Sequence, residues 1–368
     1  MRHSFMQICL ALLLALTALI RPGFAAGLPV DESSAVVLSY SRIGEDAYAA
    51  TNLRLDQFHE HLEEFKSERI NVMPLPEILT AVSAQTPLPE HTLAITFSGA
   101  FKSAYENAMK PLLEADIPFT VFFASDNADT DAGQHLNWKE LKALSENPLV
   151  SFGLLPASYT RLSAEDDSEI LRQINKARTR TREELAIEPK IFSYPFGEYS
   201  ARYKTLIKDQ GFTAAFGLHS GSIYAGADMY ALPRFSMTER YGNLDRFELV
   251  MNALPLPATE IEPQDPFLEN TMPAIGFTVT PALAENLGNL SCFISEQNAP
   301  TIEKLGENRI ELRLHEALSE ERTRVNCTIP AGDDRWRWLG MLLVLRENAE
   351  SPTLVDEEIL TSQPDALP

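Results

Sequence analysis

The stretch LAITFSGAFKSAY, residues 93–105, decides how this chain folds. Its first five residues are apolar or β-branched, which predicts a strand buried on both faces. Helical composition follows over residues 103–115. A buried strand that leads directly into a helix is the repeating unit of a parallel α/β sheet. In such a sheet the residues just after the strand, here Ser98 and Gly99, lie at the edge where functional groups gather.

The same alternation extends along most of the N-terminal two thirds of the chain. Candidate strands lie at 36–40, 93–97, 119–124, 149–153, 191–194, 213–217 and 232–235. Candidate helices lie over 55–65 and 103–115, from a cap at Ser163 and Asp166 to about Leu185, and from about Ser200 to Gly211. About seven such units predict a closed or nearly closed (β/α) barrel over residues 27–253.

The C-terminal third has a different pattern. Residues 254–273 are rich in proline and lack periodicity, which predicts a linker. Short alternating runs at 275–279, 290–295, 309–314, 324–329 and 336–344 then predict a small β-sandwich over residues 274–346. Residues 347–368 contain six acidic residues and no basic one, and are expected to be a disordered acidic tail.

Charge limits the choice of partner. The chain has 31 Lys and Arg against 52 Asp and Glu, a formal net charge of −21 at pH 7. A surface of this sign repels phosphate backbones and anionic lipids, so a nucleic-acid partner is not expected.

The first 26 residues resemble a secretory signal, with Arg2 and His3 before an apolar run and small residues near position 25. The mature protein is therefore expected to be periplasmic or secreted and without an integral membrane span, the alternative being an uncleaved N-terminal anchor. In an exported protein Cys292 and Cys327 are candidates for a disulfide, and two free buried thiols are the alternative.

Three segments carry a family resemblance: VLSYSRIG at 37–44, LAITFSGAFKSAY at 93–105 and FSYPFGEYS at 192–200. Their order and spacing resemble the polysaccharide deacetylase (NodB-homology) family over residues 36–237, and within it the deacetylases of poly-N-acetylglucosamine-type exopolysaccharides. The resemblance implies a barrel enzyme that hydrolyses amide bonds of N-acetylated glycans with a divalent metal such as zinc.

The residues that the family uses for catalysis are substituted in this chain. Where the family has a general base and a metal-binding aspartate, the chain has Ser98 and Gly99. The family's two histidine ligands align with Leu155 and Tyr159, and a histidine of the opening motif is replaced by Ser41. A segment that could supply the catalytic acid is not evident. We therefore expect no catalytic residues and no bound metal.

Several residues near the predicted strand ends could still hold a sugar, since aromatic faces stack on sugar rings and arginine binds hydroxyls or carboxylates. The glycan-binding candidates are Tyr40, Arg42, Phe101, Tyr159, Phe196, Tyr199 and Arg234. For Tyr40, Phe101 and Phe196 the alternative is packing at the barrel rim. A rebuilt metal site would have to use Asp126, Glu198 and His219.

Two further pairs of residues were weighed. His59 and His61 are two positions apart on a predicted helix, so they cannot chelate a metal together, and a surface helix is expected. Trp336 and Trp338 share one face of a predicted strand, which predicts a place in the sandwich core, with an exposed sugar-binding platform as the alternative.

The leading functional hypothesis is an exported, catalytically inactive deacetylase-like protein that binds a polysaccharide, an N-acetylated glycan or a protein of an exopolysaccharide assembly system. The first alternative is a metal-dependent polysaccharide N-deacetylase that uses unrecognised ligands. The second is a scaffold whose C-terminal domain is a protein-interaction module.

Overall fold

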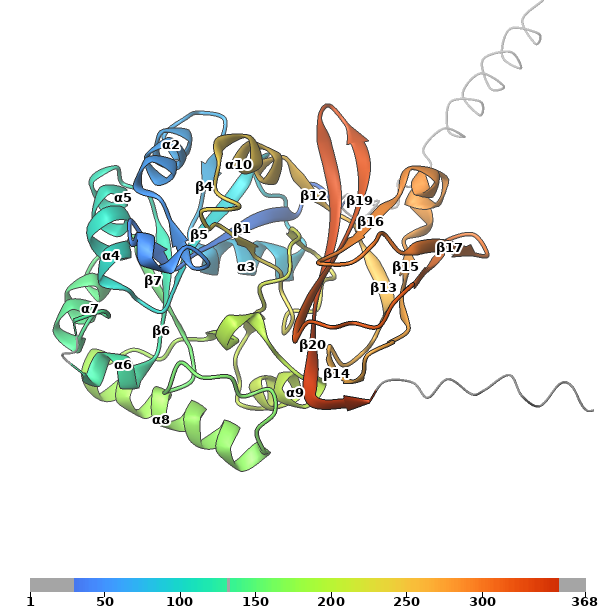
Figure 1. The fold of residues 1–368 in the computed structure, drawn as a ribbon. Helices are drawn as coiled ribbons and strands as arrows, with labels where there is room; N and C mark the ends of the chain where they lie inside the picture. The colour runs from blue at the N-terminus through green and yellow to red at the C-terminus, as the bar shows by residue number, and fades with distance from the viewer. Residues whose placement is uncertain (1–29, 131–132, 351–368) are drawn as a thin grey trace, which may run out of the picture.

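The computed structural model describes residues 30–130 and 133–350 (Figure 1). The predicted signal peptide, residues 1–26, lies outside this range, as do residues 351–368 of the predicted tail. Within the described part, the helices and the first strands form one body, and the last strands form two further sheets beside it. Among the described residues no helix is long and apolar enough to span a membrane.

The N-terminal body is built on one curled, largely parallel sheet with the strand order β10-β1-β5-β6-β7-β8-β9. Its strands are β1 Ser34–Tyr40, β5 Thr92–Ser98, β6 Phe119–Phe123, β7 Val150–Leu154, β8 Ile191–Ser193, β9 Ala214–Phe216 and β10 Ile223–Tyr224. The strands predicted up to residue 217 coincide closely with these. The seventh shortens to β11 Phe235–Ser236, which pairs with β1, while Leu232 bridges to Phe216 of β9, so this segment curls the sheet toward closure. Two short pairings add β4 Asn71–Val72 beside β5, and β2 Arg42–Ile43 beside β3 Asn52–Leu53.

Helices surround this sheet on its outer side (Figure 1). They are α2 Leu55–Phe65, α3 Leu75–Ala84, α4 Lys102–Ala104, α5 Lys110–Glu114, α6 Ser125–Asp129, α7 Trp138–Ser145, α8 Asp167–Leu185, α9 Ala201–Asp209 and α10 Leu244–Met251. Asp166 caps α8 and Ser200 caps α9, because their side chains accept the Glu169 and Tyr203 backbone N–H groups. Of the predicted cap of α8, Asp166 is thus the N-cap residue and Ser163 lies before the helix. The predicted helices do not include α3, α6, α7 and α10.

The C-terminal part contains two sheets that share one apolar cluster. The first sheet contains β12 Ala253–Pro255, β14 Phe267–Asn270, β16 Ser291–Ile294, β19 Arg322–Gly332 and β20 Arg335–Glu350. The second contains β13 Ala258–Glu262, β15 Ile275–Val279, β17 Thr301–Leu305 and β18 Arg309–Arg313. Phe277 and Ile310 from the second sheet meet Val325 and Leu343 from the first in this cluster.

The prediction of an unstructured linker over residues 254–273 is wrong. This segment contains the end of β12 and all of β13 and β14. Its prolines interrupt the apolar pattern without preventing pairing, because Pro257 and Pro263 flank β13, and Pro266 precedes β14. The predicted acidic tail also begins too early, since β20 continues to Glu350.

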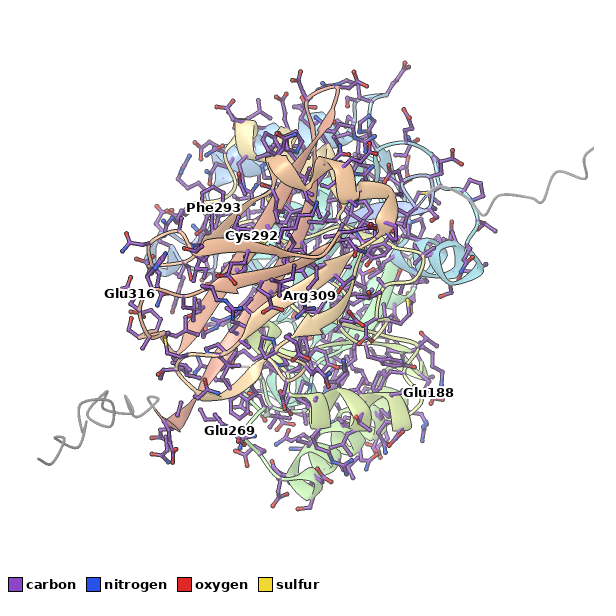
Figure 2. The ribbon with its side chains drawn as sticks, turned by 90° about the vertical axis from the view of Figure 1, so that its right-hand side faces the viewer. Glu188, Glu269, Cys292, Phe293, Arg309 and Glu316 are labelled. Atoms are coloured by element: carbon purple, nitrogen blue, oxygen red, sulfur yellow. A yellow bond between two sulfur atoms is a disulfide. The ribbon has the colours of Figure 1, made fainter. Side chains whose placement is uncertain are left out.

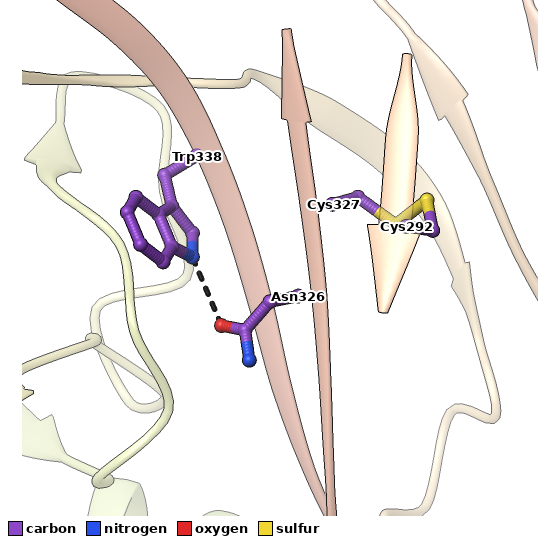
Figure 3. Close-up of a disulfide and its surroundings, with 4 residues drawn as sticks. All are labelled: Cys292, Asn326, Cys327 and Trp338. Carbon is purple, nitrogen blue, oxygen red and sulfur yellow. Dashed lines mark hydrogen bonds between the residues drawn. A yellow bond between two sulfur atoms is a disulfide. The ribbon is translucent and has the colours of Figure 1, made fainter. Parts of the chain in front are cut away.

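A disulfide joins Cys292 of β16 to Cys327 of β19, which are directly opposite each other in the first C-terminal sheet (Figure 3). The two cysteines are 35 positions apart in the chain. Closing a loop of this length restricts the unfolded chain and is expected to stabilise the fold by about 3–4 kcal/mol.

Trp338 lies between the C-terminal sheet and the barrel, not in the core between the two C-terminal sheets as predicted. Its ring meets Phe235 of β11 edge-on at 5.3 Å, and the Arg246 guanidinium lies 4.6 Å from its centre. The indole N–H donates to the Asn326 side chain at 2.9 Å (Figure 3). Trp338 is thus a contact between the two parts of the molecule.

We predict that Trp338→Ala lowers the free energy of unfolding by about 2–4 kcal/mol, because it removes a large ring from a packed contact. The matched control is Phe293→Ala, since the Phe293 side chain is 60% exposed on the outer side of the C-terminal sheets (Figure 2). Urea denaturation measures both changes. Equal losses for the two variants would contradict the assigned role of Trp338.

Candidate functional site

A cleft of about 430 Å³ opens where the parallel strands of the barrel end. Its walls come from the residues that follow β1, β5, β7 and β8, as expected for a barrel of this kind. The residues lining it are Ser39, Ser41, Arg42, Tyr48, Ala50, Thr51, Phe101, Asn127, His135, Tyr159, Phe196, Leu218, Ser236, Met237, Thr238, Arg322 and Arg324.

Aromatic rings make up much of the wall. Tyr159 and Phe196 stack with ring centres 5.3 Å apart and planes 7° from parallel. On the opposite side the Arg42 guanidinium lies between two rings, 4.0 Å from the centre of Tyr48 and 3.9 Å from that of Phe101. Flat rings beside polar groups are what a sugar-binding cleft requires. The structure therefore brings together four of the seven glycan-binding candidates, Arg42, Phe101, Tyr159 and Phe196.

Gly99 shows why a metal ligand does not fit here. Its φ is +98°, and a Cβ placed on it would lie 2.5 Å from the Phe101 ring and 3.0 Å from the Tyr159 ring. The space for a metal-binding side chain at this position is filled by two aromatic rings. Leu155, at another family ligand position, is fully buried in an apolar cluster. The residues at these positions therefore do not fit a divalent metal.

Ser98, at the position of the family's general base, has an unusual partner. Its hydroxyl lies 3.1 Å from Nη1 of Arg234, which donates to it. Arg234 is fully buried and also donates to the Gly217 carbonyl and to the hydroxyls of Thr96 and Ser193. Burial lowers its pKa to about 9. Among the described residues no carboxylate lies within 4.0 Å of this guanidinium, and Arg234 does not line the cleft as a glycan-binding candidate should.

Tyr40 is also absent from the cleft wall. It is fully buried, and its hydroxyl donates to Nδ1 of His61, while Nε2 of His61 donates to the Gly242 carbonyl. The expectation of a surface helix is correct for His59 but wrong for His61, which faces the core. The alternative interpretation of Tyr40, packing in the barrel, is the correct one.

Tyr199, the remaining candidate, lines a different cavity. This second cavity, of about 670 Å³, lies between the barrel and the first C-terminal sheet, and its walls include His219, Tyr224 and Trp338. The ring centre of Tyr199 lies 5.0 Å from that of Tyr194 and 6.4 Å from that of His219. It does not belong to the cleft at the strand ends.

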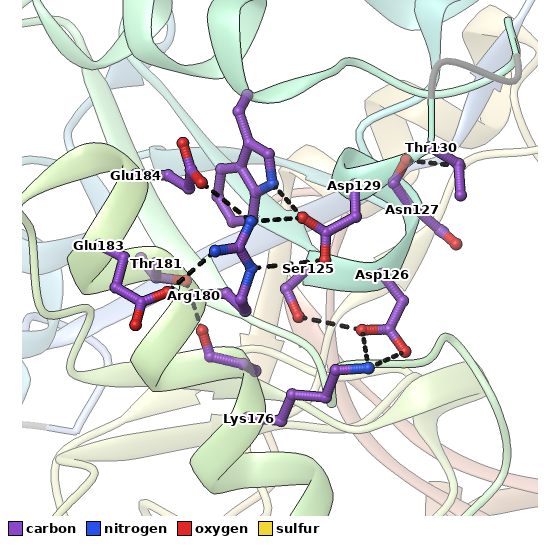
Figure 4. Close-up of polar contacts among 12 residues, drawn as sticks. Ser125, Asp126, Asn127, Asp129, Thr130, Lys176, Arg180, Thr181, Glu183 and Glu184 are labelled. Atoms are coloured by element: carbon purple, nitrogen blue, oxygen red, sulfur yellow. Dashed lines mark hydrogen bonds and ion pairs between the residues drawn. The ribbon is translucent and has the colours of Figure 1, made fainter.

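The three fallback metal ligands do not come together. Asp126 pairs with Lys176 of α8 at 2.8 Å, beside the cluster in which Arg180 binds Asp129, Glu183 and Glu184 (Figure 4). Glu198 is buried between Arg322 and Arg161, at 2.9 and 3.4 Å. His219 is buried beside the second cavity, and burial lowers its pKa to about 4. Across residues 30–130 and 133–350 no group of three or more His, Cys, Asp or Glu could hold a metal ion.

The cleft residues that sequence reasoning missed include Arg322 and Arg324, which extend from β19 of the C-terminal sheet. Arg322 donates to the Phe196 carbonyl at 2.6 Å, and Arg324 donates to the Leu218 carbonyl at 3.0 Å. Their alternation along one strand places them on one face, and the sequence shows this spacing. It does not show that this face meets the barrel mouth.

The geometry can be compared with known proteins. Residues 85–215 match the family model described as polysaccharide deacetylase. Over this segment the chain therefore matches a polysaccharide deacetylase domain. A poly-β-1,6-N-acetyl-D-glucosamine N-deacetylase of Staphylococcus aureus (strain MSSA476) is 21% identical over 233 residues, which covers 56% of this chain and 80% of that protein.

Solved structures agree on the fold of the deacetylase domain. The Streptococcus pyogenes deacetylase PplD in complex with acetate superposes with a TM-score of 0.55 at 16% identity, covering 59% of this chain and 98% of that one. IcaB from Ammonifex degensii superposes with a TM-score of 0.52 at 17% identity, covering 59% of this chain and 97% of that one.

Restoring a carboxylate beside Arg234 should stabilise the deacetylase domain. A buried charge without a partner is costly, so Ser98→Asp is expected to raise the free energy of unfolding at pH 7 by about 1–3 kcal/mol. Arg234 would lower the pKa of the new aspartate below its unfolded value of ~3.9, so the gain is present above that pH and is lost as the pH falls through the folded pKa.

Urea denaturation at pH 7 and at low pH measures this gain. The matched control is Ser98→Asn, which has a similar shape and no charge and should give no gain. A Ser98→Asp variant that is no more stable than Ser98→Asn would show that Arg234 does not need a counterion.

His61 should make stability depend on pH. Burial lowers its pKa from 6.5 to about 4. The unfolded chain then binds a proton that the folded chain does not, so stability falls as the pH drops from 6.5 toward 4, by about 3 kcal/mol for this group. Burial also lowers the pKa of His219, so this residue too should make the protein less stable as the pH falls.

In His61→Gln the stability lost between pH 6.5 and pH 4 should be smaller by about this 3 kcal/mol. The exposed His59→Gln is the control, and should leave the dependence unchanged. Urea midpoints across the pH range provide the measurement. Parallel pH curves for the wild-type protein and His61→Gln would contradict the assignment.

Proposed function

We propose that this chain is an exported, catalytically inactive polysaccharide deacetylase-like protein that binds an N-acetylated glycan in the cleft at the strand ends. The observation that carries this proposal is Gly99, where the Phe101 and Tyr159 rings fill the space for a metal-binding side chain. The same rings that exclude a metal ligand provide flat faces to the cleft.

The loss of activity follows from the groups that catalysis needs. Amide hydrolysis of this kind requires a general base and a water activated by a metal with about three protein ligands. The Ser98 hydroxyl accepts a hydrogen bond from Arg234, and within the described residues it makes no hydrogen bond to a histidine or carboxylate. Glu198, a buried carboxylate near the cleft, forms ion pairs with Arg161 and Arg322.

Binding is supported by the composition of the cleft and by the relatives. Stacked rings, hydroxyls, the Asn127 amide and three arginines line a space large enough for sugar units. A similar protein bears the name of a deacetylase of poly-β-1,6-N-acetyl-D-glucosamine, which suggests this glycan class for the first trials. We further propose that the two C-terminal sheets form a β-sandwich module, which could also dock on an exopolysaccharide assembly protein.

The test combines acetate release with binding. The purified protein should release no acetate from β-1,6-linked N-acetylglucosamine oligomers, with or without added Zn²⁺ or Co²⁺. Isothermal titration calorimetry should nevertheless detect binding. Tyr159→Leu, which keeps an apolar side chain but removes the ring, should weaken binding about tenfold, as expected when stacking is lost.

Phe293→Ala is the control for Tyr159→Leu, because it removes an exposed aromatic ring far from the cleft. Thermal unfolding of each variant checks that the fold is retained. Metal-dependent acetate release would overturn the proposed inactivity. Equal binding by wild type and Tyr159→Leu would overturn the placement of the glycan in the cleft.

A further inference from the structure

The cleft has an unusual charge for a protein of net charge −21. Among the described residues that line it, three are arginines, Arg42, Arg322 and Arg324, and none is Asp or Glu. Low-dielectric walls concentrate the field of such charges in the cleft. The cleft is therefore a positive site on an acidic molecule.

Two of these arginines are already neutralised by carboxylates just outside the lining. Arg42 pairs with Glu45 at 2.8 Å, and Arg322 pairs with the buried Glu198 at 2.9 Å. Both are also held in place by other contacts, Arg42 by its two aromatic neighbours and Arg322 by the Phe196 carbonyl. Arg42 and Arg322 therefore contribute to the shape of the cleft more than to its positive charge.

Arg324 is different. One of its nitrogens donates to the Leu218 carbonyl at 3.0 Å, and no carboxylate of the described chain lies within 4.0 Å of its guanidinium. A guanidinium has five N–H donors in a planar fork, so most of its capacity is unused. Arg324 is half-buried and close to the positive Arg322, an arrangement that an anionic ligand would stabilise.

Arg234 adds a second uncompensated charge behind the cleft. It reaches Ser98, the residue that ends β5 immediately below the Gly99 and Phe101 wall. The four oxygen atoms that accept hydrogen bonds from its guanidinium belong to neutral carbonyl or hydroxyl groups, so the field of its charge is not cancelled locally. Arg324 and Arg234 thus make the cleft positive from two sides.

The form of the cleft limits the kind of anion. A densely charged polyanion would be repelled by the acidic surface around it. A carboxylate on a sugar ring fits both the aromatic wall and the single guanidinium without a carboxylate partner among the described cleft residues. The sugar ring can stack on Tyr159 and Phe196, while the planar guanidinium of Arg324 donates two parallel hydrogen bonds to the carboxylate.

We infer that the glycan bound in this cleft is acidic, with N-acetylated sugars that alternate with carboxylate-bearing ones, and that Arg324 of the C-terminal sheet is its anion-binding residue. This inference rests on the proposed glycan-binding function and specifies its substrate class. It also makes the site composite, since the barrel contributes the stacking rings and the C-terminal sheet contributes the charge.

The probe is a hyaluronan oligosaccharide, in which N-acetylglucosamine alternates with glucuronate. Its matched control is the same oligosaccharide with every carboxyl group reduced to an alcohol. Calorimetry at low salt should show about tenfold tighter binding of the acidic form, the size expected for one charge-assisted hydrogen-bonded pair. Added salt should weaken binding of the acidic form and leave the reduced form unchanged.

Variants then assign the effect to Arg324. Arg324→Gln should weaken binding of the acidic form more than binding of the reduced form and so remove the preference, and Arg324→Lys should retain part of the preference. Arg313→Gln is the control, because Arg313 is an exposed arginine on the other C-terminal sheet, paired with Glu303 at 2.9 Å. It removes the same charge and should leave the preference intact.

The outcomes separate this inference from the proposed function. Equal binding of the acidic and reduced forms would overturn the inference and leave glycan binding standing. An equal loss for both forms in Arg324→Gln would show that Arg324 only supports the cleft wall, and would overturn its assigned role. Failure of both forms and of N-acetylglucosamine oligomers to bind would overturn the proposed function as well.

Discussion

The contact between the β19–β20 hairpin and the barrel mouth determines the rest of the site. Arg322 reaches across to the buried Glu198 and to the Phe196 carbonyl. A buried carboxylate is costly unless it is paired, so the barrel and the C-terminal sheet stabilise each other through this ion pair. The approach is close enough that a Cβ on Gly340 would lie 2.2 Å from the Ser220 carbonyl oxygen. Removing the C-terminal sheet would therefore leave Glu198 with Arg161 alone as its ion-pair partner, and would also remove Arg324.

This dependence explains which parts of the site the sequence could predict. Phe101, Tyr159 and Phe196 follow strand ends, and a parallel barrel brings strand ends together whatever its loops contain. Tyr40 and Arg234 are buried and do not line the cleft. A side chain inside or just before a strand can point into the barrel interior or toward the cleft, and the sequence does not show which. The place of Arg322 and Arg324 in the cleft could not be predicted, because it depends on how the C-terminal sheet packs against the barrel.

The fold itself was more predictable, and its errors have local causes. The strands of the barrel are continuous apolar runs, and the caps of α8 and α9 are short polar signals, so both are visible in a single sequence. Prolines misled the prediction over residues 254–273. Proline stops a strand without preventing the next, and Pro257, Pro263 and Pro266 mark the ends of β13 and the start of β14. Length was misjudged for β20, whose acidic end pairs in the sheet.

The residues at the strand end of β5 connect the proposed inactivity to the proposed binding of an acidic sugar. A carboxylate at position 98 would neutralise Arg234, and one at position 99 would need the space of two rings. With Ser98 and Gly99 in place, Arg234 keeps its charge and the rings close over the metal position. The barrel mouth then offers flat apolar faces in a positive field. In the proposed function, this combination does not activate water but holds a sugar ring whose own carboxylate supplies a negative charge beside the arginines.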